Sequence, residues 1–493
     1  MSPTTQPSLK LRTARTLKWN TIDRVSSQVL YAVTGIVLAN VLPQEDFGLV
    51  GVILIFQAFA ILFVDSGFGA ALLQKKNPDN RDYSTVFWFN LIMSTGVYVV
   101  LFFCAPLIAD IFHDDQRLIP LSRVMFASFV ISGLGIVQTN RLMKRMDVRQ
   151  VAIANVIGLV FSGGAGIWLA LTGYGAWALV WQTIILSSIK TGWLWIVERW
   201  VPELIFSMES LKNIYRIGIG VFTSSLFNTI FLNIYSFVIG AAFSFSRLGD
   251  YTQADKWSKM GSASISQILT STFIPVLAQY QDDPDGFHRL MRKINGFTAF
   301  MVFPAMLGLA VMAEPIFHLL FGTKWDSAII LFQILLVRGI FVVLTSLCNN
   351  YLLALGHAKS LVKLEVVKDI LTTAAIGATI FMHSVPALVW GQLAAGAATY
   401  AYALTLCSRN TGYRIGSFLR DQSSYLALTT AAVAPAWLLS HITHAPLPLI
   451  VIETAAMAAI YLGILRLMRN PYLLQGTDYV LGRFRNKTNN SIE

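Results

Sequence analysis

Polar and charged side chains recur at helical spacing within otherwise apolar segments of the chain. Near the N-terminus, steps of four, three, one, three and four residues connect Asn20, Arg24, Ser27, Gln28, Tyr31 and Gly35. These steps place the side chains on one face of an α-helix. Because a charge in hydrocarbon costs about 2.5–3.5 kcal/mol on insertion scales, such a face needs water or polar groups beside it. We therefore expect Arg24 and Gln28 to line a hydrophilic cavity.

Two later apolar segments carry similar stripes. The first contains Gly220, Ser224, Asn228 and Tyr235, and the second contains Lys256, Lys259, Ser266, Gln267 and Thr270. The three stripes together predict one shared cavity, with these lining residues: Asn228, Tyr235, Lys256, Lys259 and Gln267. The alternative is that these groups form hydrogen bonds between helices, which is the favoured interpretation for each Ser or Thr taken singly.

One further cation and four carboxylates lie within or beside apolar segments. Arg338 lies about 18 Å into its segment at a rise of 1.5 Å per residue, near the middle of a membrane, which predicts protein or water around it. Arg338 is therefore a further candidate for lining the substrate cavity. The candidates for binding a coupling ion are Asp23, Asp65, Glu365 and Asp369. The ion itself would be H⁺ or Na⁺, and no other cofactor or resident metal is expected.

Each acidic candidate also has a structural interpretation. Arg24 and Asp65 are both expected near the cytoplasmic side, where they form either an ion pair that ties two helices together or a cation site. Glu365 and Asp369 are one helical turn apart with lysines beside them, which is also typical of a solvated helix start.

The composition of the chain predicts that membrane-spanning helices position these residues. Hydrophobic residues make up 55% and charged residues 13% of the 493-residue chain, whereas about 25% charged residues is usual in a soluble protein. A spanning helix needs about 20 mostly apolar residues, and we count about fourteen such stretches. Their approximate cores are 18–41, 47–71, 84–108, 119–139, 150–171, 175–197, 215–240, 253–279, 294–320, 327–353, 361–382, 386–407, 424–441 and 447–468. The chain is therefore predicted to be an all-α multi-pass membrane protein.

The distribution of basic residues predicts the orientation. The chain has 37 Lys and Arg against 26 Asp and Glu, a net charge of +11. Most of the basic residues fall in alternate loops and in both terminal segments, which places the loops that carry them, and both termini, in the cytoplasm. Residues 1–18 are polar and basic without a cleavage site, so the first span is expected to direct insertion. The excess charge thus reflects topology, and no nucleic-acid partner is expected.

The chain also shows a weak internal repeat at an offset of about 210 residues, in which Leu121, Asn140 and Arg149 correspond to Leu331, Asn350 and Lys359. Two parallel halves of six helices would follow, with two extra helices at the C-terminus. The expected divisions are a first lobe over 1–198, an interfacial linker over 199–214, a second lobe over 215–408, two additional helices over 409–470 and a cytoplasmic tail over 471–493.

Several segments together resemble a known family. They are Lys18-Trp19, Asp46-Phe47-Gly48-Leu49, Asp65-Ser66-Gly67-Phe68-Gly69, Leu73-Gln74-Lys75-Lys76, Phe87-Trp88-Phe89-Asn90, the run 303–309 (FPAMLGL) and the run 321–327 (FGTKWDS). The chain resembles bacterial polysaccharide exporters of the colanic-acid-exporter type, within the multidrug/oligosaccharidyl-lipid/polysaccharide exporter superfamily. The resemblance extends from the first predicted span to about the twelfth.

This resemblance implies a V-shaped, two-lobed fold with a partly cationic central cavity. It also implies that the chain moves an undecaprenyl-diphosphate-linked oligosaccharide from the cytoplasmic to the periplasmic leaflet of the inner membrane, for capsule, exopolysaccharide or lipopolysaccharide synthesis. Arg and Lys would hold the diphosphate, while Asn, Gln, Tyr and Trp would hold sugars. Other implied partners are membrane lipids, a polysaccharide polymerase and assembly proteins.

Two other function classes are alternatives. A cation antiporter of the related multidrug branch is disfavoured by a basic cavity. A membrane-embedded polysaccharide polymerase would require a large outer loop or an extramembrane carboxylate cluster, and neither is visible. The sequence contains no G-x-x-x-x-G-K-[ST] and no H-E-x-x-H, so it offers neither a nucleotide-binding loop nor a metalloprotease helix. We therefore expect a transporter and not an enzyme.

Overall fold

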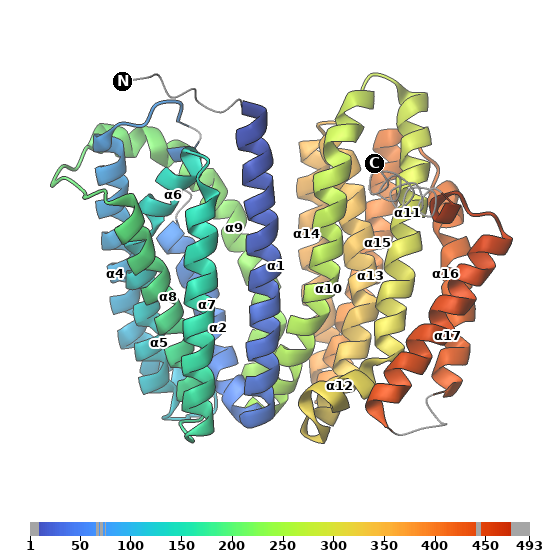
Figure 1. Cartoon of the computed structure of the whole chain (residues 1–493), viewed down its shortest axis with the longest axis horizontal. Coiled ribbons are helices and arrows are strands. Elements are labelled where there is room, and N and C mark those ends of the chain that lie inside the picture. The colour runs from blue at the N-terminus through green and yellow to red at the C-terminus, as the bar shows by residue number, and fades with distance from the viewer. Residues whose placement is uncertain (1–8, 66–68, 70–71, 74, 440–444, 475–493) are drawn as a thin grey trace, which may run out of the picture. The chain divides into compact units, whose positions relative to one another are not determined.

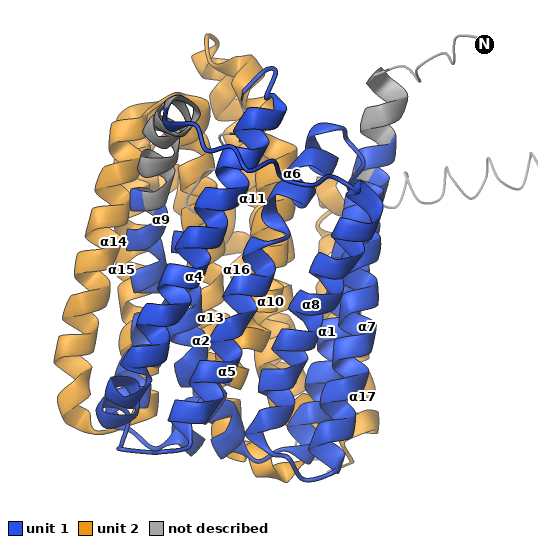
Figure 2. Cartoon of the chain, turned by 90° about the vertical axis from the view of Figure 1, so that its left-hand side faces the viewer, with its two compact units in different colours: residues 1–252 blue, residues 253–493 orange. Residues whose placement is uncertain are grey.

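The computed structural model describes residues 9–65, 69, 72–73, 75–439 and 445–474. Within these ranges the regular structure is helical, and no strand is present (Figure 1). The chain divides into two compact units, residues 1–252 and 253–493, which are coloured separately in Figure 2. The helix α10, Phe245–Leu277, begins in the first unit and continues in the second.

Unit 1 is a helical bundle in which some helices pack against their neighbours in sequence and others against distant helices. Its helices are α1 Leu9–Val41, α2 Gln44–Asp65, α4 Asn80–Ile111, α5 Leu118–Gly133, α6 Ile136–Lys144, α7 Val148–Leu171, α8 Ala176–Glu198 and α9 Met208–Ala242. Extensive contacts join α7 to both α1 and α8, and join α4 to α5. Figure 1 shows α1, α7 and α8 running through this unit. The first helix is therefore held against α7, which follows it by more than a hundred residues in sequence.

Unit 2 is a second helical bundle. Besides most of α10, its elements are η1 Ala278–Tyr280, α11 Pro284–Val311, α12 Ala313–Phe321, η2 Thr323–Trp325, α13 Asp326–Ala354, α14 Ala358–Thr379, η3 Ile380–Met382, α15 Val385–Thr411, α16 Ile415–Leu439 and α17 Pro446–Leu467. The packed pairs include α13 with α15, α14 with α15, α11 with α16, and α16 with α17. The short helix α12 contacts both α13 and α17.

Each predicted apolar stretch overlaps one or more helices, and the all-helical membrane fold is confirmed. Within the described ranges, nine helical segments are long and apolar enough to cross a membrane: Gln44–Phe63, Asn80–Ile111, Leu118–Lys144, Val148–Leu171, Ser225–Ala242, Phe245–Tyr280, Pro284–Val311, Thr323–Ala354 and Pro446–Leu467. The count of about fourteen spans stays a prediction. The predicted lobe and linker boundaries also stay predictions.

Three predicted stretches differ in detail from the observed helices. The stretch 119–139 is broken between α5 and α6, and the stretch 294–320 is broken between α11 and α12. The stretch 47–71 coincides with α2 up to Asp65, and most of its remainder lies outside the described residues. Both breaks separate a long helix from a nine-residue helix, α6 or α12.

An ion cluster ties together the end of unit 1 where α6 and α8 terminate. The Glu198 carboxylate, 1% exposed, pairs with Arg141 at 2.7 Å and with Arg145 at 3.0 Å. The Arg141 guanidinium also lies 4.7 Å from the ring centre of Tyr83 and 5.2 Å from that of Trp200. Because the buried carboxylate has two cationic partners, its charge is compensated.

A second charged cluster joins the start of α2 to the loop before α5. The Arg117 guanidinium donates hydrogen bonds to Asp115 at 2.6 and 3.0 Å and also pairs with Glu45. The hydrogen bonds from Arg117 lower the pKa of Asp115 below its usual value, because they stabilise the ionised carboxylate.

Candidate functional site

The site begins at the break between α5 and α6. Leu134 and Gly135 interrupt the helix, which leaves backbone carbonyl groups without their normal partners. Two side chains of α8 donate hydrogen bonds to these carbonyl groups. The Thr191 hydroxyl donates to the Ile131 carbonyl at 3.0 Å, and the Trp195 indole N–H donates to the Leu134 carbonyl at 2.9 Å. The break is therefore stabilised by α8 and fixes the position of α8 beside it.

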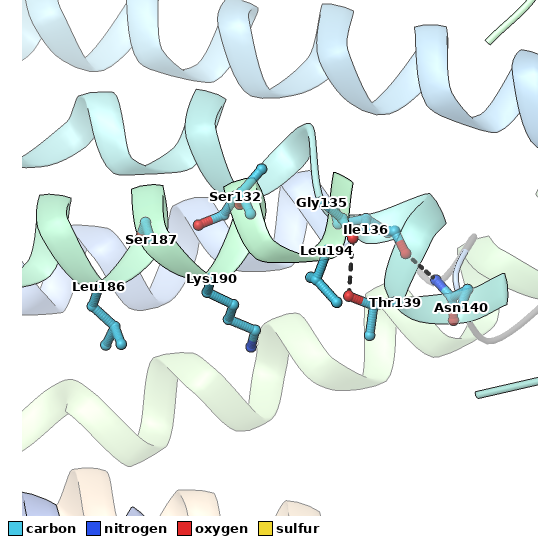
Figure 3. A pocket seen from close by; sticks show the side chains of 10 residues that line it. Ser132, Gly135, Ile136, Thr139, Asn140, Leu186, Ser187, Lys190 and Leu194 are labelled. Carbon is cyan, nitrogen blue, oxygen red and sulfur yellow. Dashed lines mark hydrogen bonds between the residues drawn. The ribbon is translucent and has the colours of Figure 1, made fainter. Parts of the chain in front are cut away.

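A pocket of about 390 Å³ lies at this break (Figure 3). Its lining comes from α5, α6 and α8 and consists of Ser132, Gly135, Ile136, Thr139, Asn140, Leu186, Ser187, Lys190, Thr191 and Leu194. Thr139 donates to the Gly135 carbonyl at 2.9 Å, and Asn140 donates to the Ile136 carbonyl at 3.0 Å. Among the described residues, the Ser132 and Ser187 hydroxyls have no hydrogen-bond partner, so they are available to a ligand.

Lys190 supplies the single charge of the pocket lining. It projects from the same side of α8 as Leu186, one turn away (Figure 3). The backbone of α7 approaches this part of α8 closely at Gly158, where a Cβ would lie 3.0 Å from Leu186 Cδ1 and 3.8 Å from the Lys190 amide nitrogen. The close approach of the two backbones fixes where the lysine leaves the helix.

An amide-bound carboxylate lies near this lysine. The Asn155 amide of α7 donates to Asp23 Oδ1 at 3.1 Å and to Oδ2 at 3.2 Å, and the Ser27 hydroxyl donates to Oδ1 at 3.4 Å. Lys190 and Asp23 attract each other electrostatically, although they do not form a direct ion pair. We call Asp23, Asn155 and Lys190 the carboxylate–amide–lysine cluster. It combines three helices, α1, α7 and α8, and both signs of charge.

The predicted lining residues of unit 1 lie on α1 and α9. Arg24 is exposed and Gln28 is half-buried on α1, while Asn228 is exposed and Tyr235 is 2% exposed on α9. The proposed Arg24–Asp65 pair falls outside the described side chains, because only the backbone of Asp65 is described. Of the predicted ion-coupling residues in this unit, Asp23 therefore has defined partners.

The predicted lining residues of unit 2 lie on α10 and α13. Lys259 forms an ion pair with Asp255, one turn earlier, at 2.6 Å, and Lys256 lies 5.4 Å from the ring centre of Trp257. Gln267 is exposed on α10. The aliphatic part of Arg338 packs where α13 meets Gly396 of α15, so this half-buried arginine has protein around it.

The two acidic candidates of α14 share one lysine. Lys368 pairs with Glu365, and its ammonium lies 3.9 Å from an Asp369 carboxylate oxygen. Glu365 is exposed and Asp369 is half-buried. In the part of the chain that the structure describes, no group of three His, Cys, Asp or Glu side chains is arranged to hold a metal ion.

Neither Asn155 nor Lys190 is among the residues predicted from the sequence to line the site. Lys190 lies within α8, eight residues before the helix ends at Glu198. A lysine inside an apolar segment was the signal that was available. The signal for Asn155 was weaker, because a single amide in a span is more often a contact between helices.

Residues 37–330 match the family model described as "Polysaccharide biosynthesis protein". The chain belongs to this family. The matched region contains the carboxylate–amide–lysine cluster except Asp23, together with the whole pocket at the α5–α6 break.

Proteins from several bacteria are similar to this chain along much of their length. The succinoglycan biosynthesis transport protein ExoT of Rhizobium meliloti is 24% identical over 97% of both chains. The lipopolysaccharide biosynthesis protein WzxC of Escherichia coli is 25% identical over 75% of both chains, and the teichuronic acid biosynthesis protein TuaB of Bacillus subtilis is 26% identical over 71% of this chain and 73% of its own.

Two solved structures share the fold. The lipid II flippase MurJ in an inward closed conformation aligns with a TM-score of 0.72 at 13% identity, over 90% of this chain and 97% of its own. A multidrug resistance transporter of the MATE family in an inward-facing conformation aligns with a TM-score of 0.60 at 16% identity, over 78% of this chain and 95% of its own. The chain therefore has the fold of a membrane flippase or transporter and functions in polysaccharide biosynthesis.

Proposed function

We propose that the chain moves an undecaprenyl-diphosphate-linked oligosaccharide across the bacterial inner membrane by alternating access. The lipid head group combines a diphosphate with a hydrated glycan, and neither crosses hydrocarbon unaided because polar groups lose their water without replacement. The observation that carries the proposal is the pocket at the α5–α6 break, where the Lys190 ammonium lies among serine and threonine hydroxyls within the helical bundle.

The pocket has the size and chemistry for part of a head group. At about 390 Å³ it is near the lower end of small-ligand pockets, so it accommodates a diphosphate or one sugar and not a whole repeat unit. An ammonium group binds phosphate oxygens strongly, and hydroxyl groups exchange hydrogen bonds with either phosphate or sugar. The glycan beyond this fragment and the polyprenyl tail would lie outside the pocket.

The carboxylate–amide–lysine cluster offers a place for ion coupling. Asp23 accepts hydrogen bonds from Asn155 and Ser27 and is attracted to Lys190. An anionic head group at Lys190 would compete with Asp23 for this attraction, which favours binding of H⁺ or Na⁺ at the carboxylate. Substrate and ion would then bias the inward and outward states together. The concentration of basic residues in alternate loops and in the terminal segments supports cytoplasmic termini for this transporter.

The proposal is tested with the purified chain in proteoliposomes that contain an undecaprenyl-diphosphate-linked oligosaccharide. A membrane-impermeant glycosidase added outside cleaves the lipids whose head groups reach the outer leaflet. We expect the wild-type chain to increase the cleaved fraction beyond that of protein-free vesicles and Lys190→Ala to abolish the increase. The matched control is Lys363→Ala, an exposed lysine of α14, which should behave as the wild type.

Two outcomes would overturn the proposal. One is a cleaved fraction that equals that of protein-free vesicles although the chain is correctly folded and inserted. The other is exchange of a cationic dye for protons in the same vesicles without movement of the lipid, which would place the chain with the multidrug antiporters.

A further inference from the structure

Unit 2 contains a carboxyl group in an unusual environment. Glu453 lies on α17, within a segment that is long and apolar enough to span a membrane. Its neighbours at intervals of four residues are Leu449, Met457, Tyr461 and Leu465, which form one face of the helix. Leu449, Tyr461 and Leu465 are 6%, 5% and 0% exposed, and Glu453 itself is 1% exposed. The carboxyl group therefore occupies a position in the buried stripe of a spanning helix.

This face of α17 packs against α11 and α12. Met457 fills the space above Gly308 of α11, and the Tyr461 hydroxyl donates to the Phe300 carbonyl of α11 at 3.0 Å. Thr454, next to Glu453, donates to the sulfur of Met312 at 3.2 Å, where α11 ends and α12 begins. These contacts hold the Glu453 side chain against protein and away from lipid.

Neither carboxyl oxygen of Glu453 has a hydrogen-bond partner among the described residues. Within the part of the chain that the structure describes, no cation forms an ion pair with Glu453. The outer half of α11, residues 294–311, and residues 422–439 of α16 contain no Asp, Glu, Lys, Arg or His. On α12 and η2 the cationic candidates are His318, which pairs with Asp326 of α13 at 2.9 Å, and Lys324. The charged group that acts on Glu453 is instead another carboxylate, Glu314 of α12.

The two glutamates have opposite surroundings. Glu314 is exposed and lies in the first turn of α12, where the helix dipole favours negative charge. Glu453 is buried, unpaired and close to that negative charge, and both conditions disfavour its ionised form. An ionised carboxylate in this place would cost several kcal/mol, whereas the neutral acid loses only its hydrogen bonds to water. Environments that separate two carboxyl groups in this way are typical of proton-binding pairs.

We propose that Glu453 is a proton-binding site, with the exposed Glu314 as the group through which protons enter and leave. The proton can dissociate only when water or a cation reaches Glu453, which requires α17 to separate from α11 and α12. Proton occupancy is therefore linked to the packing of α17. This inference concerns the α12–α17 pair alone and does not depend on the substrate of the transporter.

The direct test is infrared spectroscopy of the purified full-length chain in lipid nanodiscs at neutral pH. A protonated carboxyl group has its own carbonyl stretching band, which a carboxylate or an amide lacks. We expect this band in the wild type, its loss in Glu453→Gln, and its retention in the matched control Glu314→Gln. Should Glu453→Gln not fold, Glu453→Leu serves the same purpose, because leucine continues the apolar stripe. Identical spectra of the wild type and the Glu453 variant in this region would overturn the proposal.

A second measurement follows from proton linkage. The folded chain keeps a proton that the unfolded chain releases above about pH 4.3, so the folded state binds more protons and loses stability as pH rises. Glu453→Gln carries no such proton. Relative to this variant, the unfolding equilibrium constant of the wild type should rise by up to about tenfold per pH unit until Glu453 ionises in the folded chain. A difference between the two proteins that stays constant from about pH 5 to about pH 8 would contradict the proposal.

Discussion

Asn155 holds both carboxylate oxygens of Asp23 with its side-chain nitrogen, at 3.1 and 3.2 Å, and so connects α7 to α1. An amide nitrogen donates hydrogen bonds without carrying charge, so it stabilises the carboxylate without neutralising it. The Asp23 carboxylate, held in this way, attracts Lys190 of α8 electrostatically.

Replacing this amide by a carboxyl group should make transport depend on pH. In Asn155→Asp two carboxyl groups would lie within hydrogen-bonding distance, and they cannot both be ionised without strong repulsion. The pair would share a proton and titrate as a unit. We expect transport by Asn155→Asp to be reduced at neutral pH and to recover at lower pH, when measured as glycosidase-accessible lipid in proteoliposomes.

The control for this prediction is Ser27→Ala, which removes the longer hydrogen bond to Asp23, at 3.4 Å, and adds no charge. This variant should keep the pH profile of the wild type. A profile of Asn155→Asp that is parallel to that of the wild type would show that Asp23 takes no part in coupling.

The helices of this fold are predictable from the sequence, but some of their ends are not. Long apolar runs such as those of α7 and α13 leave little choice in a membrane. The breaks at Leu134–Gly135 and at Met312 are local features within such runs. Signals were present in the second case, because Glu314 and Pro315 are typical of the first turn of a new helix. A hydropathy average over about 20 residues does not reveal these local signals, because the apolar residues on both sides dominate it.

The candidate site was less predictable, because its contacts join distant parts of the chain. Asp23 was identified from its position in an apolar segment, but its partner Asn155 is 132 residues away. Which face of α7 meets α1 depends on side-chain packing throughout the bundle, and one sequence does not specify it. Glu453 was overlooked for a different reason. It is a single acidic residue in a 22-residue apolar helix, and its burial becomes apparent only when α12 is in place.

The ion cluster around Glu198 should contribute strongly to the stability of unit 1. Glu198→Ala leaves Arg141, with a side chain only 15% exposed, without its carboxylate partner. Breaking a buried pair in this way typically costs about 3–5 kcal/mol. We expect a marked drop in the melting temperature of the purified chain, measured by tryptophan fluorescence, to which Trp200 beside Arg141 contributes.

The control is Asp147→Ala at the same end of the unit. Asp147 is exposed and makes no side-chain capping bond at the start of α7, so its loss should cost less than about 1 kcal/mol. Equal melting temperatures of the two variants would mean that the Glu198 cluster does not stabilise the fold.

The Arg117–Asp115 pair should stabilise the folded chain by an amount that decreases as pH falls. Arg117 lowers the pKa of Asp115 in the folded chain, so the stabilisation is complete above the unfolded value of about 3.9 and is lost as pH falls through the lower folded value. At neutral pH, Arg117→Gln should therefore lower the free energy of unfolding by about 1 kcal/mol or less, because the arginine is half-exposed. Its melting temperature should lie slightly below that of the wild type.

Acidification should close this gap. As pH falls through the lowered pKa of Asp115, this carboxyl group becomes protonated in both folded proteins, and the two melting temperatures should converge. A gap that is the same at acidic and neutral pH would show that Arg117 acts through packing and not through the charge of Asp115.

Gly48 of α2 and Gly249 of α10 lie where the two helices are in close contact, and neither position should accept a larger residue. A Cβ on Gly48 would lie 1.8 Å from the Phe245 carbonyl oxygen, and one on Gly249 would lie 2.0 Å from that of Gln44. Both obstacles are backbone atoms, which cannot rotate away as a side chain does, so the helices would have to separate. We expect Gly48→Ala and Gly249→Ala each to destabilise the chain by about 1–3 kcal/mol or more.

The control is Gly96→Ala on α4. A Cβ at this position meets nothing within 4 Å, so the change should be neutral or slightly stabilising, because alanine favours helices. If melting curves of the purified variants place Gly48→Ala beside Gly96→Ala, the close packing of α2 against α10 is wrong.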